Sequence, residues 1–285
     1  MEFIIEDNIL KKCTGDETEL TVPNGITEIW GGAFKGCPNL TTITLPDSIK
    51  KVAKSAFNME IFDENKKVVS NNKLTCNLSP KLYVRLVKKT QQIAGQCLYK
   101  FAGQPDFITV KGVLYTYQGT ESKIRIPDDV TEIYMGAFYE NAVIEEVTVP
   151  SSVKEMGKWA FYWCNNLKKV VFEDNGVQRI EEQCFMNCRK LEEVHLPEGL
   201  GVIMHAAFEG TASLKRVELP KTLWSVSDGA FSLSGLETIE VPEKMKNISG
   251  GAFKYSKIEG GTIKVPAECN VAKDAFNDGV TVVKE

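Results

Sequence analysis

The chain of 285 residues is 43% hydrophobic and 25% charged, the composition of an ordinary folded protein rather than of a disordered or collagen-like chain. Its 34 basic and 38 acidic residues give a net charge of -4 at pH 7, so the protein as a whole does not attract nucleic acid or an anionic membrane. No apolar run reaches the roughly 20 residues of a membrane helix, and the acidic start Met1–Asp7 lacks the basic region of a signal peptide.

The first array, residues 1–62, introduces a unit that repeats along the chain. In two copies, the phenylalanine of an Ala-Phe pair lies 11 residues after a proline. Before the second proline, the alternation of Ile43 and Leu45 predicts a short strand with both side chains inward. Pro46 ends that strand, and apolar residues three and six positions later line the return path. Their spacing fits neither a long helix nor a long strand, so we expect short extended pieces and helical turns there.

Residues 63–106 form a degenerate, basic middle segment. Val87 stands where the repeat has proline, and Leu98 stands where it has phenylalanine. Over 41 residues of this segment there is no Asp or Glu, and eight Lys and Arg give a local charge of +8. One interpretation is that these side chains are merely solvated. The other is a docking patch for an anionic partner within Lys66–Lys100, with candidate contacts at Lys81, Arg85, Lys88 and Lys89.

The second array, residues 107–285, has the most regular repeats. Its repeat phenylalanines are 22 to 24 residues apart, at Phe138, Phe161, Phe185, Phe208, Phe231, Phe253 and Phe276. Landmarks of the first array recur here 104 residues later, as Phe3 does at Phe107, so both arrays are expected to open with a hairpin-like coil. A constant period in the twenties is typical of a solenoid, because a single unit of this length cannot bury its apolar residues alone. We therefore predict one elongated solenoid domain over residues 1–285, continuous through the middle segment.

The repeat L-x-x-I-x-L-P-x-x-I-x-x-I-x-x-x-A-F-x-x-C resembles the BspA-like subclass of leucine-rich repeats, most clearly at residues 40–57, 191–208 and 214–231. The resemblance implies a right-handed, curved solenoid with a parallel β-sheet on its concave face. It also implies a binding or adhesion role, at a cell surface or in a secreted protein, and it carries over no catalytic residues and no cofactor.

The eight cysteines are interpreted as reduced core residues. Cys37, Cys164 and Cys188 each lie three residues after a repeat phenylalanine, and Cys97 and Cys184 occupy the alanine position, where a small apolar side chain fits. No C-x-x-C occurs and neither histidine has zinc-site spacing to a cysteine, so we expect no metal site. A disulfide between Cys164 and Cys188, in neighbouring coils, is the main alternative.

Charged pairs change sign from one coil to the next in the second array. They read Glu145-Glu146, Lys168-Lys169, Glu192-Glu193 and Lys215-Arg216. Parallel strands in register would set each acidic pair beside a basic pair, which favours a charge ladder that fixes the register. The alternative is an amphoteric ligand surface. His195, in the neighbouring row, is expected to be a solvated surface residue rather than a catalyst.

Aromatic residues supply the candidate contacts of the second array. Tyr139, Tyr162, Trp163 and Tyr255 follow repeat phenylalanines by one or two residues, at the corner of the coil. Exposed Tyr and Trp are favoured anchors for protein partners and sugar rings, although they also pack corners. No P-loop, G-x-S-x-G or H-E-x-x-H motif occurs, so an enzyme is not expected. The sequence predicts a protein- or glycan-binding module, with a structural spacer of a larger surface protein or assembly as the alternative.

Overall fold

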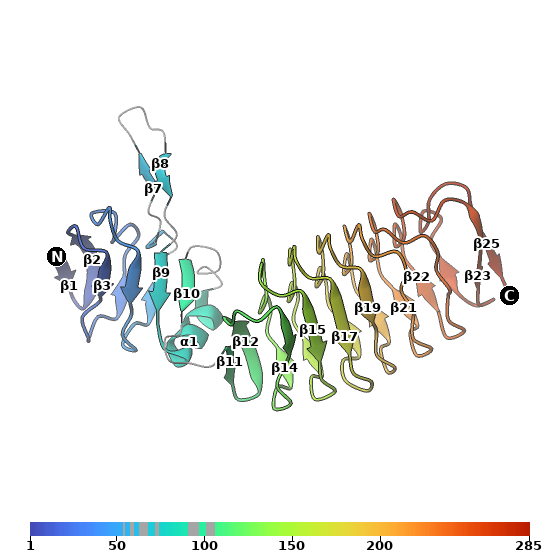
Figure 1. Ribbon diagram of the computed structural model, residues 1–285, viewed down its shortest axis with the longest axis horizontal. Helices are drawn as coiled ribbons and strands as arrows, with labels where there is room; N and C mark the ends of the chain where they lie inside the picture. Colours follow the sequence, from blue (N-terminus) through green and yellow to red (C-terminus); the bar gives the residue numbers. More distant parts are fainter. Residues whose placement is uncertain (54, 58–59, 63–67, 72–73, 91–96, 101–105) are drawn as a thin grey trace. The chain divides into compact units, whose positions relative to one another are not determined.

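The computed structural model describes residues 1–53, 55–57, 60–62, 68–71, 74–90, 97–100 and 106–285. They form two compact units, Met1–Pro105 and Asp106–Glu285, and each unit is described here by itself (Figure 1). Within both units, most strand pairs are parallel and join neighbouring coils. The parallel β-solenoid expected from the repeats is therefore confirmed, whereas the prediction of one domain, the handedness and the curvature stay predictions. Among the described residues, no helix combines the length and the apolar character needed to span a bilayer.

Two rows of parallel strands run along the second unit. The first row is a sheet of β13 (Lys123–Arg125), β15 (Glu146–Val149), β17 (Lys169–Phe172) and β19 (Glu193–His195). The second row consists of two-residue strands: β14 (Glu132–Ile133), β16 (Glu155–Met156), β18 (Arg179–Ile180), β20 (Val202–Ile203), β21 (Ser225–Val226), β22 (Asn247–Ile248) and β24 (Asn270–Val271). An antiparallel hairpin of β11 (Phe107–Val110) and β12 (Val113–Tyr117) precedes these coils and pairs with β14, while β23 (Gly261–Val265) and β25 (Val280–Lys284) form a further parallel pair.

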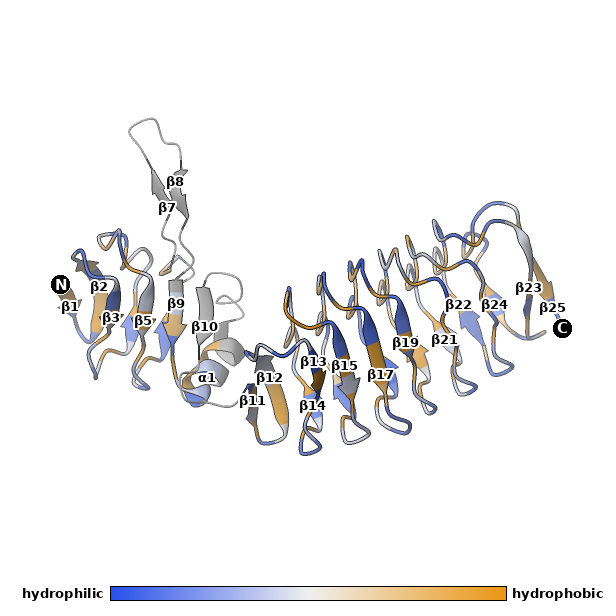
Figure 2. Cartoon of the chain, in the orientation of Figure 1, coloured by the Kyte–Doolittle hydropathy of each residue, from blue (hydrophilic) through white to orange (hydrophobic). Residues whose placement is uncertain are grey.

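The coils are in the register that the repeat predicts. Val147 pairs with Val170, and Val170 pairs with Val194, so equivalent inward residues stack on one another. Residues on either side of them point outward because side chains alternate along a strand, and burial accordingly alternates along β15 and β17. Hydrophilic and hydrophobic residues both occur along these strands (Figure 2). Pro150 directly follows β15 and has no N–H to offer a further ladder bond.

A third side of each coil, here called the turn edge, surrounds the repeat phenylalanine. The backbone N–H of Phe161 donates to Cys184 of the next coil at 2.9 Å, and Phe185 donates to Ala207 at 2.8 Å. Two residues before and two residues after Phe185, Gln183 and Asn187 adopt φ angles of 55° and 61°. Left-handed and right-handed backbone conformations alternate along the turn edge. The N–H group of every second residue can therefore donate a hydrogen bond to the next coil.

The prediction of helical turns on the return side was wrong. Residues 106–285 are all described and contain no helix, and their return side consists of turns and two-residue strands. An α-helix would use each N–H within its own segment, four residues back. Here the N–H groups at every second position of the turn edge bond to the neighbouring coil instead, so coil stacking takes the donors that a helix needs.

The core of the second unit is a file of phenylalanine rings. Successive rings are nearly parallel, with centroids 4.5 to 5.4 Å apart, at Phe138, Phe161, Phe185, Phe208, Phe231, Phe253 and Phe276. The small residue before each ring is also buried, either alanine or, at position 184, cysteine. The buried placement predicted for the cysteines is confirmed for seven of them, and the side chain of Cys97 lies outside the described residues.

The first unit also opens with an antiparallel hairpin, of β1 (Glu2–Glu6) and β2 (Ile9–Thr14). Thus both predicted opening hairpins are present. One sheet continues from β2 to β4 (Glu28–Ile29) and β6 (Lys51–Val52), and the other contains β3 (Glu19–Thr21), β5 (Thr42–Thr44), β9 (Leu74–Asn77) and β10 (Cys97–Lys100). A separate antiparallel pair is formed by β7 (Glu60–Phe62) and β8 (Val68–Asn71).

The middle segment contains α1 (Pro80–Thr90), the only helix within the described residues. Its start is capped by Ser79, whose Oγ accepts the N–H of Leu82 at 3.0 Å. The helix occupies the start of the copy of the repeat expected at residues 86–98, so this copy departs from the coil of the other repeats. Leu98 lies in β10, which pairs in parallel with β9 and so continues the strand row.

Candidate functional site

Three of the four predicted aromatic contacts lie together on the turn edge of the second unit. The rings of Tyr139 and Tyr162, from neighbouring coils, stack with centroids 5.1 Å apart and an interplanar angle of 12°. The ring of Trp163 lies 6.0 Å from that of Tyr162 at an angle of 10°. Tyr139 is 49% exposed and Trp163 is 40% exposed, so this group of rings faces solvent.

The backbone explains why these rings point outward. Phe138 and Phe161 point into the core, so the following residues, Tyr139 and Tyr162, point away from it. Trp163 has a φ of 57°, in the left-handed region that costs a non-glycine residue about 1–2 kcal/mol. The coil therefore holds a large apolar side chain outward at a position where glycine would adopt the backbone conformation at the lowest cost. The equivalent position of another coil is a glycine, Gly210.

Trp159 lies on the same turn edge, where its carbonyl accepts the N–H of Tyr162, and it was missed by the sequence analysis. It is 39% exposed, has a φ of 60°, and its indole N–H donates to the side-chain oxygen of Gln183 in the next coil. The available signal was its place two residues before Phe161, where other coils carry Gly136, Gly229 or Gly251. We refer to Tyr139, Tyr162, Trp163 and Trp159 as the aromatic turn patch.

Tyr255 lies elsewhere on the same edge. It is 66% exposed with a φ of 61°, and it occupies the same repeat position as Trp163. The coils of Phe185, Phe208 and Phe231 separate the two residues. Leu233 of the adjacent coil is the exposed apolar residue that shares this position with Tyr255. Tyr255 is thus not part of the aromatic turn patch.

The tyrosine at the start of the patch is neutral over the ordinary pH range. Partial burial, followed by the nearby Glu140 carboxylate, raises the pKa of the Tyr139 phenol above its usual value of 10. Tyr139 therefore offers a hydroxyl that can donate or accept a hydrogen bond, together with an apolar ring. The aromatic turn patch combines these properties without a charged group of its own.

The predicted basic contacts are only partly described. Lys81 is exposed at the start of α1, whereas Arg85 is half-buried and its guanidinium donates to the backbone carbonyl of Asp47. Ser79 also donates to the Asp47 carboxylate, so Arg85 helps to hold the helix against an earlier coil. The side chains of Lys88, Lys89 and Lys100 and the whole of Lys66, Lys67 and Lys73 lie outside the described residues. Binding of an anionic partner at Lys66–Lys100 stays a prediction.

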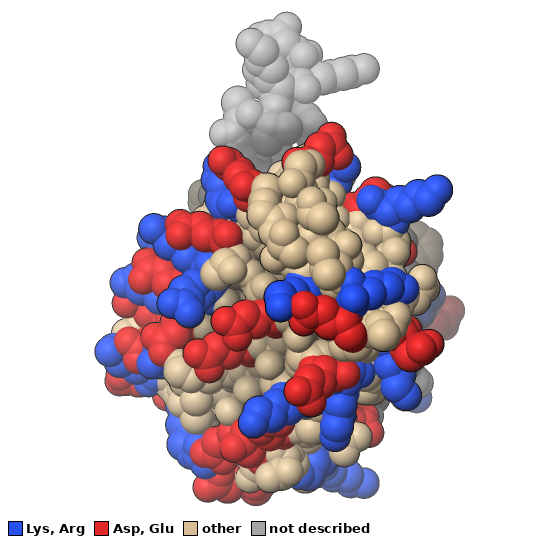
Figure 3. All heavy atoms as spheres, turned by 90° about the vertical axis from the view of Figure 1, so that its right-hand side faces the viewer, with Lys and Arg blue, Asp and Glu red and all other residues tan. Residues whose placement is uncertain are grey.

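The alternating charges of the second array pair between coils as predicted. Lys168 Nζ lies 2.8 Å from Glu145, Lys169 Nζ lies 2.7 Å from Glu193, and Lys215 Nζ lies 3.8 Å from Glu237. Acidic and basic side chains are intermingled over the end of the molecule seen in Figure 3. His195 is an exposed residue that contacts Glu193, in agreement with its predicted surface position. These pairings favour the charge ladder over an amphoteric ligand surface.

A model of the BspA type leucine-rich repeat region matches residues 4–76, 114–175 and 163–281, in 6 copies. The chain belongs to the BspA-type leucine-rich repeat family. A leucine-rich repeat protein from Bacteroides ovatus is 17% identical, with a TM-score of 0.57 over 100% of this chain and 97% of that one. A leucine-rich cell surface protein from Faecalibacterium prausnitzii is 18% identical, with a TM-score of 0.48 over 99% of this chain and 93% of that one. At 17% identity the likeness to the Bacteroides ovatus protein shows the fold alone. No curated protein is a significant match.

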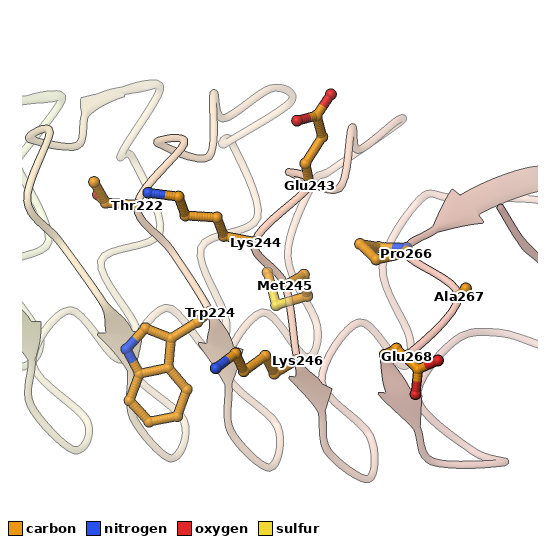
Figure 4. A pocket seen from close by; sticks show the side chains of 9 residues that line it. All are labelled: Thr222, Trp224, Glu243, Lys244, Met245, Lys246, Pro266, Ala267 and Glu268. Atoms are coloured by element: carbon orange, nitrogen blue, oxygen red, sulfur yellow. The ribbon is translucent and has the colours of Figure 1, made fainter.

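A hollow of about 570 Å³ lies along the segments that precede β21, β22 and β24 of this BspA-type protein (Figure 4). Its walls include Trp224, Met245 and Lys246, and its far side is formed by Pro266 and Glu268. Trp224 is 47% exposed, and its indole nitrogen lies 2.7 Å from the place where a Cβ on Gly201 would be. Glycine at 201 thus makes room for the indole. The hollow carries both lysines and glutamates, so its charge does not select one class of ligand.

Proposed function

We propose that this protein is a non-catalytic binding module and that the aromatic turn patch is its contact surface for a protein partner. The observation that carries the proposal is the stack of rings on a regular backbone edge, in which exposed Tyr139 and Trp163 lie on either side of half-buried Tyr162. Exposed Tyr and Trp side chains dominate the energy of many protein interfaces. A cluster of them on the surface is a common mark of an interaction site.

The patch is ordered before any partner arrives. The N–H of Glu140 donates to the carbonyl of Tyr162 at 2.8 Å, and the N–H of Trp163 donates to Met186 at 3.0 Å. These bonds tie the backbone of each exposed ring to the next coil. Preorganisation of this kind lowers the conformational entropy that binding would otherwise cost.

The stacking favours a protein partner over a sugar. A sugar ring inserted between two aromatic rings needs a contact of about 3.5 Å on each side, so the rings would have to be about 7 Å apart. Tyr139 and Tyr162 are 5.1 Å apart, and Tyr162 has a second near-parallel neighbour at 6.0 Å. A sugar ring therefore does not fit between these rings, whereas the exposed parts of Tyr139 and Trp163 can contact apolar and polar side chains of a protein.

The surroundings of the patch support binding rather than catalysis. Within the described residues, no group of three or more His, Cys, Asp and Glu side chains is placed to hold a metal ion. The family consists of repeat scaffolds that are generally non-catalytic. The binding role therefore needs only the side chains that the turn edge presents.

Differential capture tests this function. The immobilised wild-type chain is compared with the triple variant Tyr139→Ala/Tyr162→Ala/Trp163→Ala and with Trp224→Ala, an exposed tryptophan outside the patch. We expect the wild type and Trp224→Ala to capture at least one protein in similar amounts. The triple variant should capture more than about tenfold less of that protein. Equal capture by all three chains would contradict the proposal. Binding on a glycan array that only the triple variant loses would assign the patch to sugars, and no binding in either assay would favour the structural spacer.

A further inference from the structure

Two cysteines meet where the opening hairpin of the first unit packs against the first coil. Cys13 lies on β2, and Cys37 lies three residues after the repeat phenylalanine Phe34. Their sulfur atoms are 3.2 Å apart, with the Cys37 thiol donating to Cys13, and both side chains are fully buried. A disulfide bond of about 2.05 Å would need only a small approach of the two sulfur atoms.

The backbone holds these two segments close together. The N–H of Cys13 donates to Ala33 at 2.7 Å, and the N–H of Gly15 donates to Gly36 at 3.2 Å. A Cβ on Gly36 would lie 2.5 Å from the carbonyl oxygen of Cys13, a separation that real side chains do not tolerate. Glycine at 36 therefore permits the approach that brings the two thiols together.

The equivalent junction of the second unit contains no cysteine at either position. At the offset of 104 residues, Tyr117 stands for Cys13 and Asn141 stands for Cys37. Tyr117 packs on Phe138 with ring centroids 6.1 Å apart, and the Asn141 side chain accepts the N–H groups of Val143 and Ile144. The junction between the opening hairpin and the first coil thus has cysteine at both positions in the first unit and at neither position in the second unit.

The other inter-coil cysteines bond differently. The thiols of Cys164 and Cys188 each donate to a backbone carbonyl of the preceding coil, at Phe138 and Phe161, both at 3.0 Å. Burial, followed by a contact with the Cys188 side chain, raises the pKa of the Cys164 thiol, so these two cysteines also interact with each other. The Cys37 thiol, in contrast, donates directly to the Cys13 sulfur at 3.2 Å. The sequence favoured reduced cysteines, with a Cys164–Cys188 bridge as the main alternative. The bonds of those two thiols to carbonyl oxygens, against the direct sulfur–sulfur contact at Cys13 and Cys37, favour the latter pair for a bridge.

We propose that Cys13 and Cys37 form a disulfide that locks the opening hairpin to the first coil when the chain folds in the presence of a low-molecular-weight disulfide. The Cys37 thiolate attacks one sulfur of the reagent, forms a mixed disulfide and releases one reagent thiolate. The Cys13 thiolate then attacks the Cys37 sulfur and releases the second reagent thiolate. Two electrons pass to the reagent, and the two protons lost by the cysteines pass through solvent to the released thiolates.

The same burial makes the reaction slow in the folded, reduced protein. Burial, together with the hydrogen bond from Cys37, raises the pKa of the Cys13 thiol to about 12. Because the thiolate is the reactive form, we place the reaction in folding or in transient opening of the hairpin.

Oxidative refolding followed by peptide mapping tests the pair. The full chain is refolded from denaturant in glutathione redox buffer or in dithiothreitol, then denatured, alkylated and digested. After oxidative refolding we expect six of the eight cysteines to be alkylated and one linked peptide to join Cys13 to Cys37. Refolding in dithiothreitol should leave all eight alkylated. The double variant Cys164→Ala/Cys188→Ala should still form the linked peptide.

The proposal fails if all eight cysteines are alkylated after oxidative refolding. It also fails if Cys13 is linked to other cysteines as often as to Cys37. The mapping uses the wild-type chain, so it gives a result even if a cysteine variant does not fold. A second measurement is amide hydrogen exchange in β1 and β2, which the bridge should slow by at least about tenfold relative to the reduced chain. Equal exchange in the two forms would contradict the lock.

Discussion

Phe208 and Tyr139 differ by one position in the repeat, yet they face opposite environments. Phe208 is fully buried and stacks at 5.1 Å on both Phe185 and Phe231. Its replacement in Phe208→Ala should lower the free energy of unfolding by about 3–5 kcal/mol, because the ring leaves a cavity in the core. Tyr139→Ala loses chiefly one ring contact at a half-exposed site and should cost about 0.5–1.5 kcal/mol. Equal shifts of the urea midpoint in the two variants would overturn this assignment of inside and outside.

A glycine of the turn edge tests the left-handed backbone. Gly251 has a φ of 63°, and the nearest atom to a Cβ built there is 3.9 Å away, so the site has room for a methyl group. Gly251→Ala should nevertheless lower the free energy of unfolding by about 1 kcal/mol, since the left-handed conformation disfavours any side chain. The urea midpoint measures this effect. A variant as stable as the wild type would show that the turn edge does not need this conformation.

The two rows of strands and the turn edge differ in how far the sequence predicts them. The alternation of Ile43 and Leu45 predicts β5 and its inward face because period two has one structural meaning. The turn edge was predicted as helical turns, since its alternating φ angles leave no comparable hydrophobic period. Trp159 was missed because its signal lay in other coils, where Gly136, Gly229 and Gly251 occupy the position two residues before the repeat phenylalanine. The phase of the phenylalanines was enough to find Tyr139, Tyr162 and Trp163, but not to separate Tyr255 from them.

The charge ladder of the second unit should make its stability depend on pH in acid. Lys168 lowers the pKa of Glu145, and Arg125 lowers that of Glu173, both below the ordinary value of about 4.5. The stabilisation is therefore present above about pH 4.5 and is lost as the pH falls through the lowered values, because the unfolded chain then binds more protons. The urea midpoint should fall over this range, and it should fall less in Glu145→Gln/Glu173→Gln. An equal fall in both chains would assign the acid effect to other groups.

Basic residues of the middle segment have two different surroundings, one bonded to a neighbouring coil and one exposed to solvent. Arg85 bonds to Asp47, whereas Lys81 is exposed on the same helix. If the segment binds anionic partners, heparin should bind at low salt and dissociate as the screening length falls to about 8 Å at physiological salt. Lys81→Gln/Lys88→Gln/Lys89→Gln, which leaves Arg85 in place, should abolish binding without lowering the urea midpoint. If the wild type does not bind heparin at low salt, the prediction of a docking patch is wrong.

In the second unit as a whole, both the backbone and the core residues hold neighbouring coils against one another. Strand pairs, the N–H groups of the turn edge and the phenylalanine file join each coil to its neighbours, and lysine–glutamate pairs do so on the surface. In such repeat proteins, each unit contacts mainly the units beside it, so outward side chains can vary without altering the fold. This separation explains why the sequence predicts the fold of this chain more fully than its ligand. Large apolar side chains occupy such outward positions in the aromatic turn patch and also at Trp224, Leu233 and Tyr255.

Affinity for a protein found by differential capture tests the central claim most directly. The dissociation constant is measured for the wild type, for Tyr139→Ala/Tyr162→Ala/Trp163→Ala and for Trp224→Ala, each checked for an unfolding midpoint that shows a folded chain. The triple variant should bind at least about 30-fold more weakly, since the loss of anchor residues at an interface typically costs 2 kcal/mol or more. Trp224→Ala should bind within about twofold of the wild type. A folded triple variant with wild-type affinity would contradict the assignment of the aromatic turn patch as the binding surface.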